Sequence, residues 1–287
     1  MQYCLNLPNG GAGGDARTLG ELAALAEDAG WDAVLLEDYL VYQNRQDLPT
    51  YDPWIALAVM ALRTQQIRLG TEVTPLARRR PWKVAREAVT LDHLSGGRLI
   101  LAVGLGLASD ASFSRFGEIT DDRQRAAMLD EALDVLVGLW SGEPFSYTGQ
   151  HYRVREVTFL PRPVQRPRIP IWVGGGYPNL GPLRRAARWD GACLYRAPAA
   201  GSAQDTGEGL TPEDVRAVRS YVQQRRGAAA PFDIVAGGPQ RRADWDQERA
   251  RIRALADAGA TWWVEWVPPV DLETMRAAIV RRPLRVG

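Results

Sequence analysis

Short, continuous apolar runs alternate with longer amphipathic segments along almost the whole chain. The run at 33–36, Ala-Val-Leu-Leu, contains no polar residue. A strand buried on both faces has this pattern, because helices cover both sides of a parallel sheet. The segment before it carries apolar residues at helical spacing, among them Leu19, Leu22 and Ala26. The pattern therefore predicts repeated βα units.

Eight buried strands are expected, at residues 3–7, 33–36, 67–74, 98–103, 171–173, 191–195, 232–236 and 262–267. Eight strands close a (β/α)8 TIM barrel, and 287 residues is a usual length for one. The helix-end, turn and strand sequence at 28–36 is echoed at 257–265 and, more weakly, at 187–195. We therefore predict a single α/β domain over residues 1–287 with this barrel fold; an open doubly wound sheet is the alternative.

Two segments depart from the βα rhythm. Residues 142–170 contain scattered aromatic and β-branched residues followed by several prolines, which predicts a small β excursion near the barrel. Excursions of this kind often cover a site. Residues 197–209 are small and polar, which is typical of a mobile loop.

Capping signals mark the starts of two helices. Thr18 and Glu21 have the spacing of a capping box, and Asp52 followed by Pro53 reads as a cap and a first helical position. We expect the first two helices to begin at these residues.

The composition excludes several kinds of partner and site. Lys+Arg 35 against Asp+Glu 34 leaves a net charge of only +1, so no overall field favours nucleic acid or an anionic membrane. Only two cysteines, no leader-like N-terminus and no apolar run of transmembrane length predict a cytoplasmic protein. His93 and His151 are the only histidines, too few for a multi-histidine metal site. A small organic substrate and a cofactor that carries the chemistry fit best.

The active face of a (β/α)8 barrel lies at the carboxyl ends of its strands. Glycines follow three of the expected strands, at 104–106, 174–176 and 237–238, and would let a flat ring or a phosphate approach the backbone. Arg78, Arg79 and Arg80 stand just before Pro81, beside the positive end of a helix dipole. Cations are unfavourable there unless an anion offsets them, so we expect a bound phosphate or else a solvated charge cluster.

Five segments together resemble the bacterial luciferase-like flavin oxidoreductases. They are Leu-Gly-Thr-Glu-Val-Thr-Pro at 69–75, Arg-Arg-Pro at 79–81, Leu-Asp-His-Leu-Ser-Gly-Gly-Arg at 91–98, Val-Gly-Leu-Gly at 103–106 and Pro-Ile-Trp-Val-Gly-Gly at 170–175. The resemblance covers almost the whole chain. It implies a (β/α)8 barrel that binds reduced FMN or the deazaflavin coenzyme F420, and it favours a homodimer. It also implies a cis peptide bond between Glu72 and Val73, behind the flavin ring.

The resemblance assigns coenzyme contacts, with Gly104 and Gly106 along the ring and the glycines at 174–176 at the ribityl phosphate. The predicted coenzyme-binding residues are Asn6, Thr71, Glu72, Val73, Arg79, Arg80, Gly104, Leu105, Gly106, Gly174, Gly175 and Gly176. The predicted substrate pocket is aromatic and consists of Tyr42, Trp54, Tyr195 and Trp266. We predict no metal.

Two departures from the family pattern bear on the reaction. Deazaflavin members commonly have Asp-His after strand two, where this chain has Asp38 and Tyr39, so Asp38 and Tyr39 are the catalytic candidates, with Tyr39 as proton donor. Leu107 replaces an acidic residue of some sugar-phosphate dehydrogenases in the family, which argues against that substrate class.

Three functions remain open. The first is F420-dependent hydride transfer to or from a small organic substrate. The second is oxygenation by reduced FMN, with a separate flavin reductase as partner. The third is a barrel that binds flavin without turnover.

Overall fold

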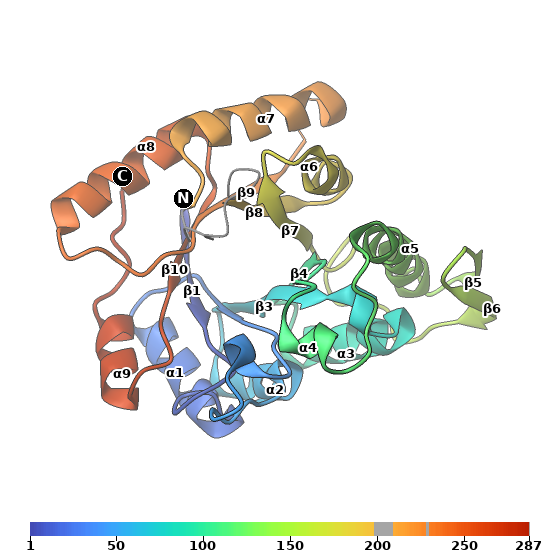
Figure 1. Ribbon diagram of the computed structural model, residues 1–287, viewed down its shortest axis with the longest axis horizontal. Coiled ribbons are helices and arrows are strands. Elements are labelled where there is room, and N and C mark those ends of the chain that lie inside the picture. Colours follow the sequence, from blue (N-terminus) through green and yellow to red (C-terminus); the bar gives the residue numbers. More distant parts are fainter. Residues whose placement is uncertain (198–208, 228–229, 287) are drawn as a thin grey trace.

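The chain forms a closed barrel of parallel strands, seen in a computed structural model that describes residues 1–197, 209–227 and 230–286 (Figure 1). Around the barrel the order is β1-β10-β9-β8-β7-β4-β3-β2. The strands are β1 (Gln2–Leu7), β2 (Ala33–Leu36), β3 (Arg68–Pro75), β4 (Leu99–Gly104), β7 (Ile171–Tyr177), β8 (Gly191–Arg196), β9 (Asp233–Gly237) and β10 (Trp262–Trp266). Because β1 pairs with both β2 and β10, the sheet has no edge. The (β/α)8 prediction is confirmed and the open doubly wound sheet is wrong.

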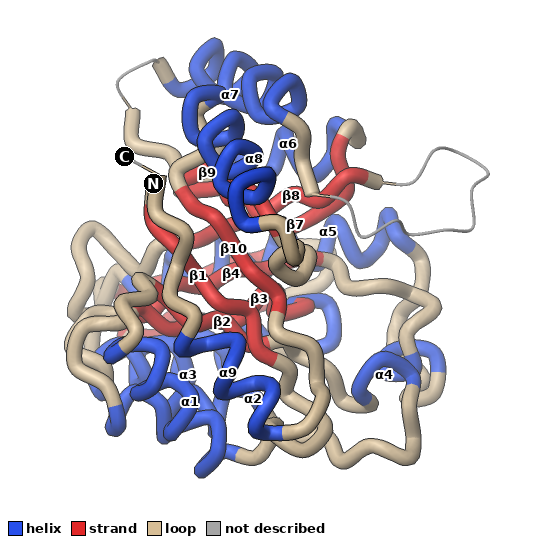
Figure 2. Tube along the Cα trace, turned by 90° about the vertical axis from the view of Figure 1, so that its left-hand side faces the viewer, coloured by secondary structure: helices blue, strands red, loops and turns tan. Residues whose placement is uncertain are grey.

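Helices surround the strands on the outside of the barrel (Figure 2). They are α1 (Ala16–Asp28), α2 (Pro53–Arg63), α3 (Pro81–Leu94), α4 (Ala111–Ser114), α5 (Asp122–Trp140), α6 (Leu180–Ala186), α7 (Pro212–Arg226), α8 (Trp245–Ala258) and α9 (Leu272–Val280), with 3-10 turns η1 (Tyr42–Asn44) and η2 (Leu76–Arg78). No helix in the described ranges is both long and apolar enough to cross a membrane.

One of the two predicted helix starts is correct. Asp52 caps α2 by accepting from the backbone N–H of Ile55, with Pro53 in the first turn. The capping box predicted at Thr18 is wrong, because α1 begins earlier and Asp15 caps it, accepting from the N–H of Arg17 and of Thr18. An aspartate three residues upstream satisfies the free N–H groups before Thr18 is reached.

The expected β excursion is an antiparallel hairpin of β5 (Pro144–Thr148) and β6 (Arg153–Thr158), which projects beside α5 in Figure 1. Glu131 of α5 holds the hairpin turn by accepting from the backbone N–H of Gln150, His151 and Tyr152 at 2.7, 2.9 and 3.0 Å. The interior of the loop predicted at 197–209 lies outside the described residues.

Two layers of side chains fill the core, one between strands and helices and one inside the barrel. The inner layer consists of Cys4, Ala33, Leu35, Ile100, Ala102, Trp172, Cys193, Val235, Trp262 and Val264. Successive side chains of a strand point to opposite faces, so the residue two positions further along each strand also points inward. These next inward residues form the carboxyl end of the barrel interior, where the candidate site lies.

The Leu-Asp-His-Leu-Ser-Gly-Gly-Arg segment is a structural joint between α3 and β4. Arg98 donates to the carbonyl oxygens of Ala61, Thr64, Ile67 and Ser95, at 2.6 to 3.0 Å, and so ties the end of α2 to the start of β3. A single guanidinium thereby satisfies four carbonyl groups at helix and strand ends. This motif therefore frames the barrel at the end opposite the site.

Candidate functional site

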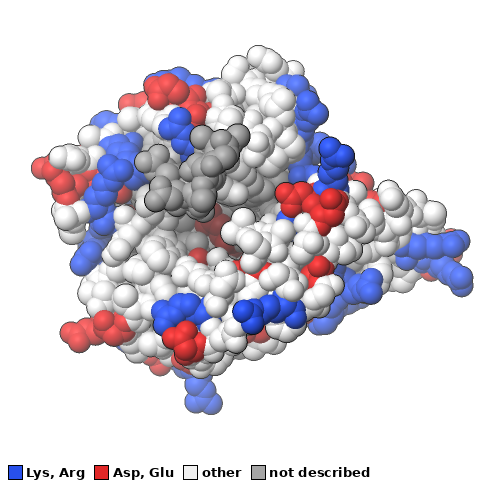
Figure 3. Space-filling view, in the orientation of Figure 1, with Lys and Arg blue, Asp and Glu red and all other residues white. Residues whose placement is uncertain are grey.

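A cavity of about 650 Å³ opens at the carboxyl ends of the barrel strands. It is lined by residues at and just after the ends of β2, β3, β4, β7 and β8, together with Arg125 of α5 and Arg185 of α6. The strand-end residues include Glu37, Asp38, Tyr39, Glu72, Val73, Arg78, Gly104, Leu105, Gly106, Gly174, Gly175, Gly176 and Tyr195. Figure 3 shows a hollow near the centre of this face, with acidic side chains inside it. The volume is within the range of small-molecule and cofactor sites.

One side of the cavity is built from glycines packed around Val73. A Cβ atom at Gly104 would lie 2.8 Å from Cγ2 of Val73, and one at Gly174 would lie 2.7 Å from its Cγ1. Side chains therefore do not fit at these two strand ends without moving Val73. The peptide bond between Glu72 and Val73 is cis, as the resemblance implied. The bare backbone of β4 and β7 beside Val73 leaves room for a flat ring system.

The other side of the cavity carries two carboxyl groups on neighbouring strands. Glu37 and Glu72 are the residues directly after the registered pair Leu36 and Thr71 of β2 and β3. Glu37 lies two positions beyond the inward-facing Leu35, and both carboxyl groups line the cavity. The Glu37 Oε2 atom accepts a hydrogen bond of 2.6 Å from the phenol of Tyr42.

Burial changes the protonation of both carboxyl groups. It raises the pKa of Glu37 to about 7, against the opposing effect of Tyr42 and Trp266. Burial, together with the negative charge of Glu37, raises the pKa of Glu72 to about 7. The buried Oε2 of Glu72 and the buried Oδ1 of Asn6 have no hydrogen-bond partner among the described residues. Polar atoms of this kind in a cavity wall commonly meet a ligand or water.

Asp38 is the anion that offsets the arginine cluster. Its Oδ1 lies 2.7 Å from Arg78 and 2.9 Å from Arg79, and the side chains of Asp38 and Arg78 are 0% and 3% exposed. Arg79 and Arg80 do not line the cavity, and Arg80 is the exposed N-cap of α3. Neither a bound phosphate nor solvent is therefore needed to offset Arg78 and Arg79, because a carboxylate of the chain itself lies between them.

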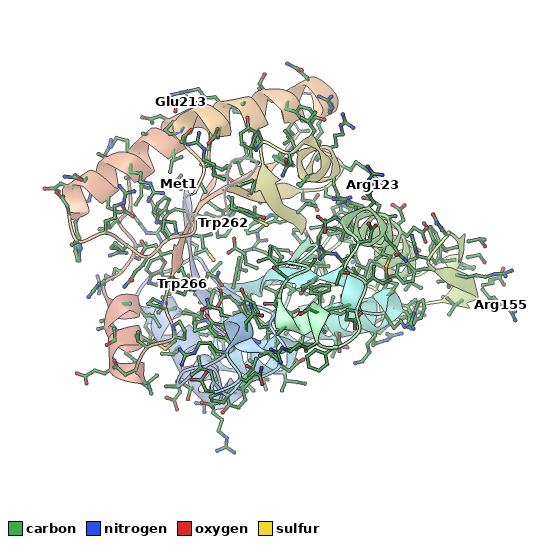
Figure 4. The ribbon with its side chains drawn as sticks, in the orientation of Figure 1. Met1, Arg123, Arg155, Glu213, Trp262 and Trp266 are labelled. Atoms are coloured by element: carbon green, nitrogen blue, oxygen red, sulfur yellow. The ribbon has the colours of Figure 1, made fainter. Side chains whose placement is uncertain are left out.

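Only some of the predicted catalytic and substrate-binding residues line the cavity. Tyr39 and Tyr195 line the cavity. Tyr42 is fully buried behind Glu37, and Trp54 is 6% exposed within α2, so neither forms part of the cavity wall. Trp266 ends β10, as Figure 4 shows, and lies near Glu37. Aromatic composition did not separate the wall residues Tyr39 and Tyr195, which are partly exposed, from the buried packing residues Tyr42 and Trp54, because aromatic side chains occur in both places.

Two further predicted coenzyme residues lie beside the cavity. Thr71 is buried and its hydroxyl lies 2.7 Å from that of Thr74, so it ties the two halves of the bulged strand β3. Asn6 is the inward residue that follows Cys4 on β1. The remaining predicted glycines, with Leu105, belong to the cavity wall.

Sequence reasoning missed Arg125 and Arg185. Arg125, from α5, is 2% exposed and donates to the carbonyl oxygens of Leu105 and Gly106 at 2.8 and 2.9 Å. Arg185, from α6, is paired with Asp130 at 2.7 Å. Both line the cavity, but neither follows a strand, so the strand-end rule gave no signal for them. Within the described ranges, no group of three or more histidine, cysteine, aspartate or glutamate residues is placed to hold a metal ion.

Sequence comparison relates the chain to known oxidoreductases. It is 33% identical over 161 residues to an F420-dependent glucose-6-phosphate dehydrogenase of Microbacterium testaceum, covering 55% of this chain and 46% of that protein. It is 34% identical over 164 residues to an F420-dependent hydroxymycolic acid dehydrogenase of Mycobacterium tuberculosis, covering 56% and 44%. The chain thus spans about half the length of the curated relatives it matches.

Solved structures share the fold. An F420-dependent secondary alcohol dehydrogenase in complex with an F420-acetone adduct superposes with a TM-score of 0.78 at 16% identity, covering 99% of each chain. The monooxygenase RslO1 from Streptomyces bottropensis gives 0.75 at 21% identity, covering 97% of this chain and 96% of the other. The family model for luciferase-like monooxygenases matches residues 3–204, which include six of the eight barrel strands, β1 without Gln2, and most of the cavity wall. The chain therefore belongs to the luciferase-like monooxygenase family.

Proposed function

We propose that this protein is an F420-dependent oxidoreductase acting on a small organic substrate. The observation that carries the proposal is the cavity wall at Val73, Gly104 and Gly174. A Cβ atom at either glycine would collide with Val73, so the wall is bare backbone against which a flat ring can lie. The bound deazaflavin would supply a hydride donor or acceptor at one ring carbon. Val73 and the glycines would orient the ring against the carboxyl side of the cavity.

The choice of F420 rests on the relatives found by sequence. The two curated relatives described above, matched at 33% and 34% identity, are both named F420-dependent dehydrogenases. The monooxygenases among the similar structures share the fold at 21% identity or less. Oxygenation with reduced FMN and a partner reductase is thus the second candidate, and it is supported by the fold of RslO1 and of a long-chain alkane monooxygenase.

The cavity wall also supports roles for individual residues. Gly174, Gly175 and Gly176 are proposed to follow the coenzyme from the ring edge beside Val73, at Gly174, to the ribityl phosphate, with Gly104, Leu105 and Gly106 along the ring. Arg79 and Arg80, which do not line the cavity, are less suited to the phosphate than Arg78, which does. Tyr39 and Tyr195 line the space left for substrate. The family resemblance further supports a homodimer.

A fluorescence titration with F420 and with FMN, in parallel, tests the proposal. Gly174→Ala should weaken F420 binding by at least about tenfold, since its Cβ would push Val73 toward the ring. Gly181→Ala is the matched control, because a Cβ at this nearby position in α6 meets nothing within 4 Å. A thermal melt of each variant shows that the fold is kept.

The outcomes separate the candidate functions. Saturable binding of F420 but not FMN, lost in Gly174→Ala and kept in Gly181→Ala, supports the F420 enzyme. Binding of reduced FMN alone would instead favour the oxygenase and a partner reductase. A folded protein that binds neither would contradict both.

A further inference from the structure

The carboxyl groups of Glu37 and Glu72 have no task in coenzyme binding as proposed above. They extend from adjacent strands, one residue beyond the registered pair Leu36 and Thr71. Both face the cavity rather than the outer helices. Parallel strands in register bring such neighbours close together, and two close carboxyl groups in a buried site do not both ionise readily.

No cation among the described residues is a cause of the raised pKa values of Glu37 and Glu72, and Arg125 and Arg185, which line the same cavity, are paired with Asp122 and Asp130. The groups that face the carboxyl pair are the thiols of Cys4 from β1 and Cys193 from β8 and the phenols of Tyr39 and Tyr42 from the segment after β2. Burial raises the pKa of both thiols and of the Tyr42 phenol, so these three groups are neutral near pH 7. The neighbouring cation, Arg78, is bound by Asp38.

The two carboxyl groups differ in their hydrogen bonds. Glu37 accepts a short hydrogen bond from Tyr42, whose ring is fully buried and fixed against Tyr39, with 5.2 Å between the ring centroids. A donated hydrogen bond stabilises the charged form of a carboxyl group. The Oε2 atom of Glu72 has no hydrogen-bond partner among the described residues. The charge thus belongs on Glu37 and the proton on Glu72.

We propose that Glu37 and Glu72 hold one proton between them and that Glu72 is the catalytic acid and base of the reaction, a role for which this chain has no histidine after β2. The proposal rests on the proposed function. When hydride reaches a carbonyl carbon of the substrate, the π electron pair of the C=O bond moves to oxygen. The oxygen then takes the proton from Glu72, whose O–H bond breaks and leaves its electron pair on the carboxylate. In the opposite direction Glu72 takes the proton from an alcohol as hydride leaves its carbon.

This arrangement assigns Glu37 and Tyr42 as positioning residues. They act through Glu72, because the fixed negative charge on Glu37 keeps the proton on its neighbour. The hydride itself is exchanged with F420, which is oxidised as a ketone is reduced, so that atoms and electrons balance.

Infrared difference spectroscopy of the free protein, without coenzyme, tests the shared proton. The C=O stretching band of a protonated carboxyl group should disappear as the pH rises through about 7. Glu72→Gln should remove the part of this band that comes from Glu72 and leave the part from Glu37, whose pKa is also raised to about 7. Glu143→Gln, at an exposed position, is the control and should leave the band unchanged. No such band just below pH 7, or a band as strong in Glu72→Gln as in the wild-type protein, would overturn the proposal.

Binding of F420 tests whether the protonated carboxyl group lies next to the bound coenzyme. A ring bound beside the pair displaces water from the cavity around it and favours its neutral form, so the wild-type protein should take up protons on binding at slightly alkaline pH. A pH indicator in weak buffer measures this uptake. The uptake should be smaller in Glu72→Gln and unchanged in Glu143→Gln, and equal uptake in all three proteins would overturn the assignment.

Steady-state kinetics of the wild-type protein and of Glu72→Gln test the catalytic role of Glu72. With a carbonyl substrate, Glu72→Gln should lower kcat by roughly 10²–10⁴-fold and change KM little, as expected for a lost general acid. An unchanged kcat would overturn the catalytic role. If the wild-type protein fails to bind F420 at all, the proposed function fails, while the infrared titration still decides whether the pair holds a proton.

Discussion

At the scale of single residues, a buried carboxylate holds the arginines of the loop that follows β3 in place. Asp38 lies between Arg78 and Arg79 with its side chain removed from solvent. Arg78 also donates to the Asp38 backbone carbonyl. A buried ion pair contributes little by itself, but removing one partner leaves the other charge buried and uncompensated. We therefore expect Asp38 to stabilise the fold. Its position after β2 predicts a catalytic role, which its buried ion pairs make less suitable.

Asp38→Asn should lower the free energy of unfolding by about 3–5 kcal/mol, because two arginines lose their counter-charge. Urea unfolding followed by circular dichroism measures the change. Asp47→Asn removes the partner of Arg45 in a solvent-exposed pair and is expected to have no measurable effect. Equal losses in the two variants would contradict the assignment.

The carboxyl pair should also make stability depend on pH. The pKa of Glu72 is about 7 in the folded protein and about 4.5 in an unperturbed carboxyl group, so the folded state binds the proton more tightly. This stabilisation is complete below about pH 4.5 and is lost as the pH rises through about 7. For one carboxyl group the loss is on the order of 3 kcal/mol.

Unfolding free energies of the wild-type protein and of Glu72→Gln, measured across this pH range, test the prediction. The difference between the two proteins should change steadily in favour of Glu72→Gln as the pH increases. Parallel curves would mean that Glu72 titrates as an ordinary carboxyl group.

At the scale of elements, the joints between helices and strands hold the frame that the cavity depends on. Arg98 fastens the end of α2 and the start of β3 to the turn before β4. Asp92, at the end of α3, accepts from the backbone N–H of Val164 and Gln165, at 2.6 and 3.1 Å, and fixes the chain after the β5–β6 hairpin. The segment that most resembles the family is thus a scaffold element.

Arg98→Ala should destabilise the protein by roughly 2–4 kcal/mol, because several carbonyl groups lose their donor at once. Chemical unfolding gives the value. Arg155→Ala, at the exposed tip of β6 in Figure 4, is the control and should unfold like the wild-type protein. A small effect of Arg98→Ala would show that water replaces the guanidinium at these carbonyl groups.

At the scale of the whole molecule, the first and last strands close the barrel. β1 pairs with β10, and the two ends of the chain lie side by side in Figures 1 and 2. The backbone N–H of Val286 donates to the phenol oxygen of Tyr3 at 2.7 Å, and Arg285 contacts Asp32 at 3.1 Å. Leu284 is 5% exposed and packs in the outer core.

Removal of residues 284–287 should therefore cost about 3 kcal/mol, chiefly from the lost burial of Leu284. A thermal melt followed by both tryptophan fluorescence and circular dichroism should show one shifted, coincident transition. Tyr3→Phe alone removes only the hydrogen bond to Val286 and should shift the melt less. Two separate transitions in the truncated protein would show that closure is not cooperative with the rest of the barrel.

Much of this fold is predictable because its signals are local. Apolar runs such as 33–36 and 99–103 identify strands whichever strands they pair with, and all eight expected strands are present within a few residues. The residues at 104–106 and 174–176 could be assigned to the site from the sequence, because the carboxyl ends of all barrel strands lie on one face. Helix starts were less certain, since Asp15 and Thr18 are both good caps and only one is used.

By itself, then, the sequence determined the strands, the barrel and the end of it that carries the site, since periodicity and turn chemistry act over a few residues. Only the tertiary structure decided which side chains meet. It paired Asp38 with arginines some 40 residues away, placed Trp54 in the packing around the barrel and set Glu37 beside Glu72. Such contacts depend on strand register and on which face each residue presents, and a shift of one residue reverses that face.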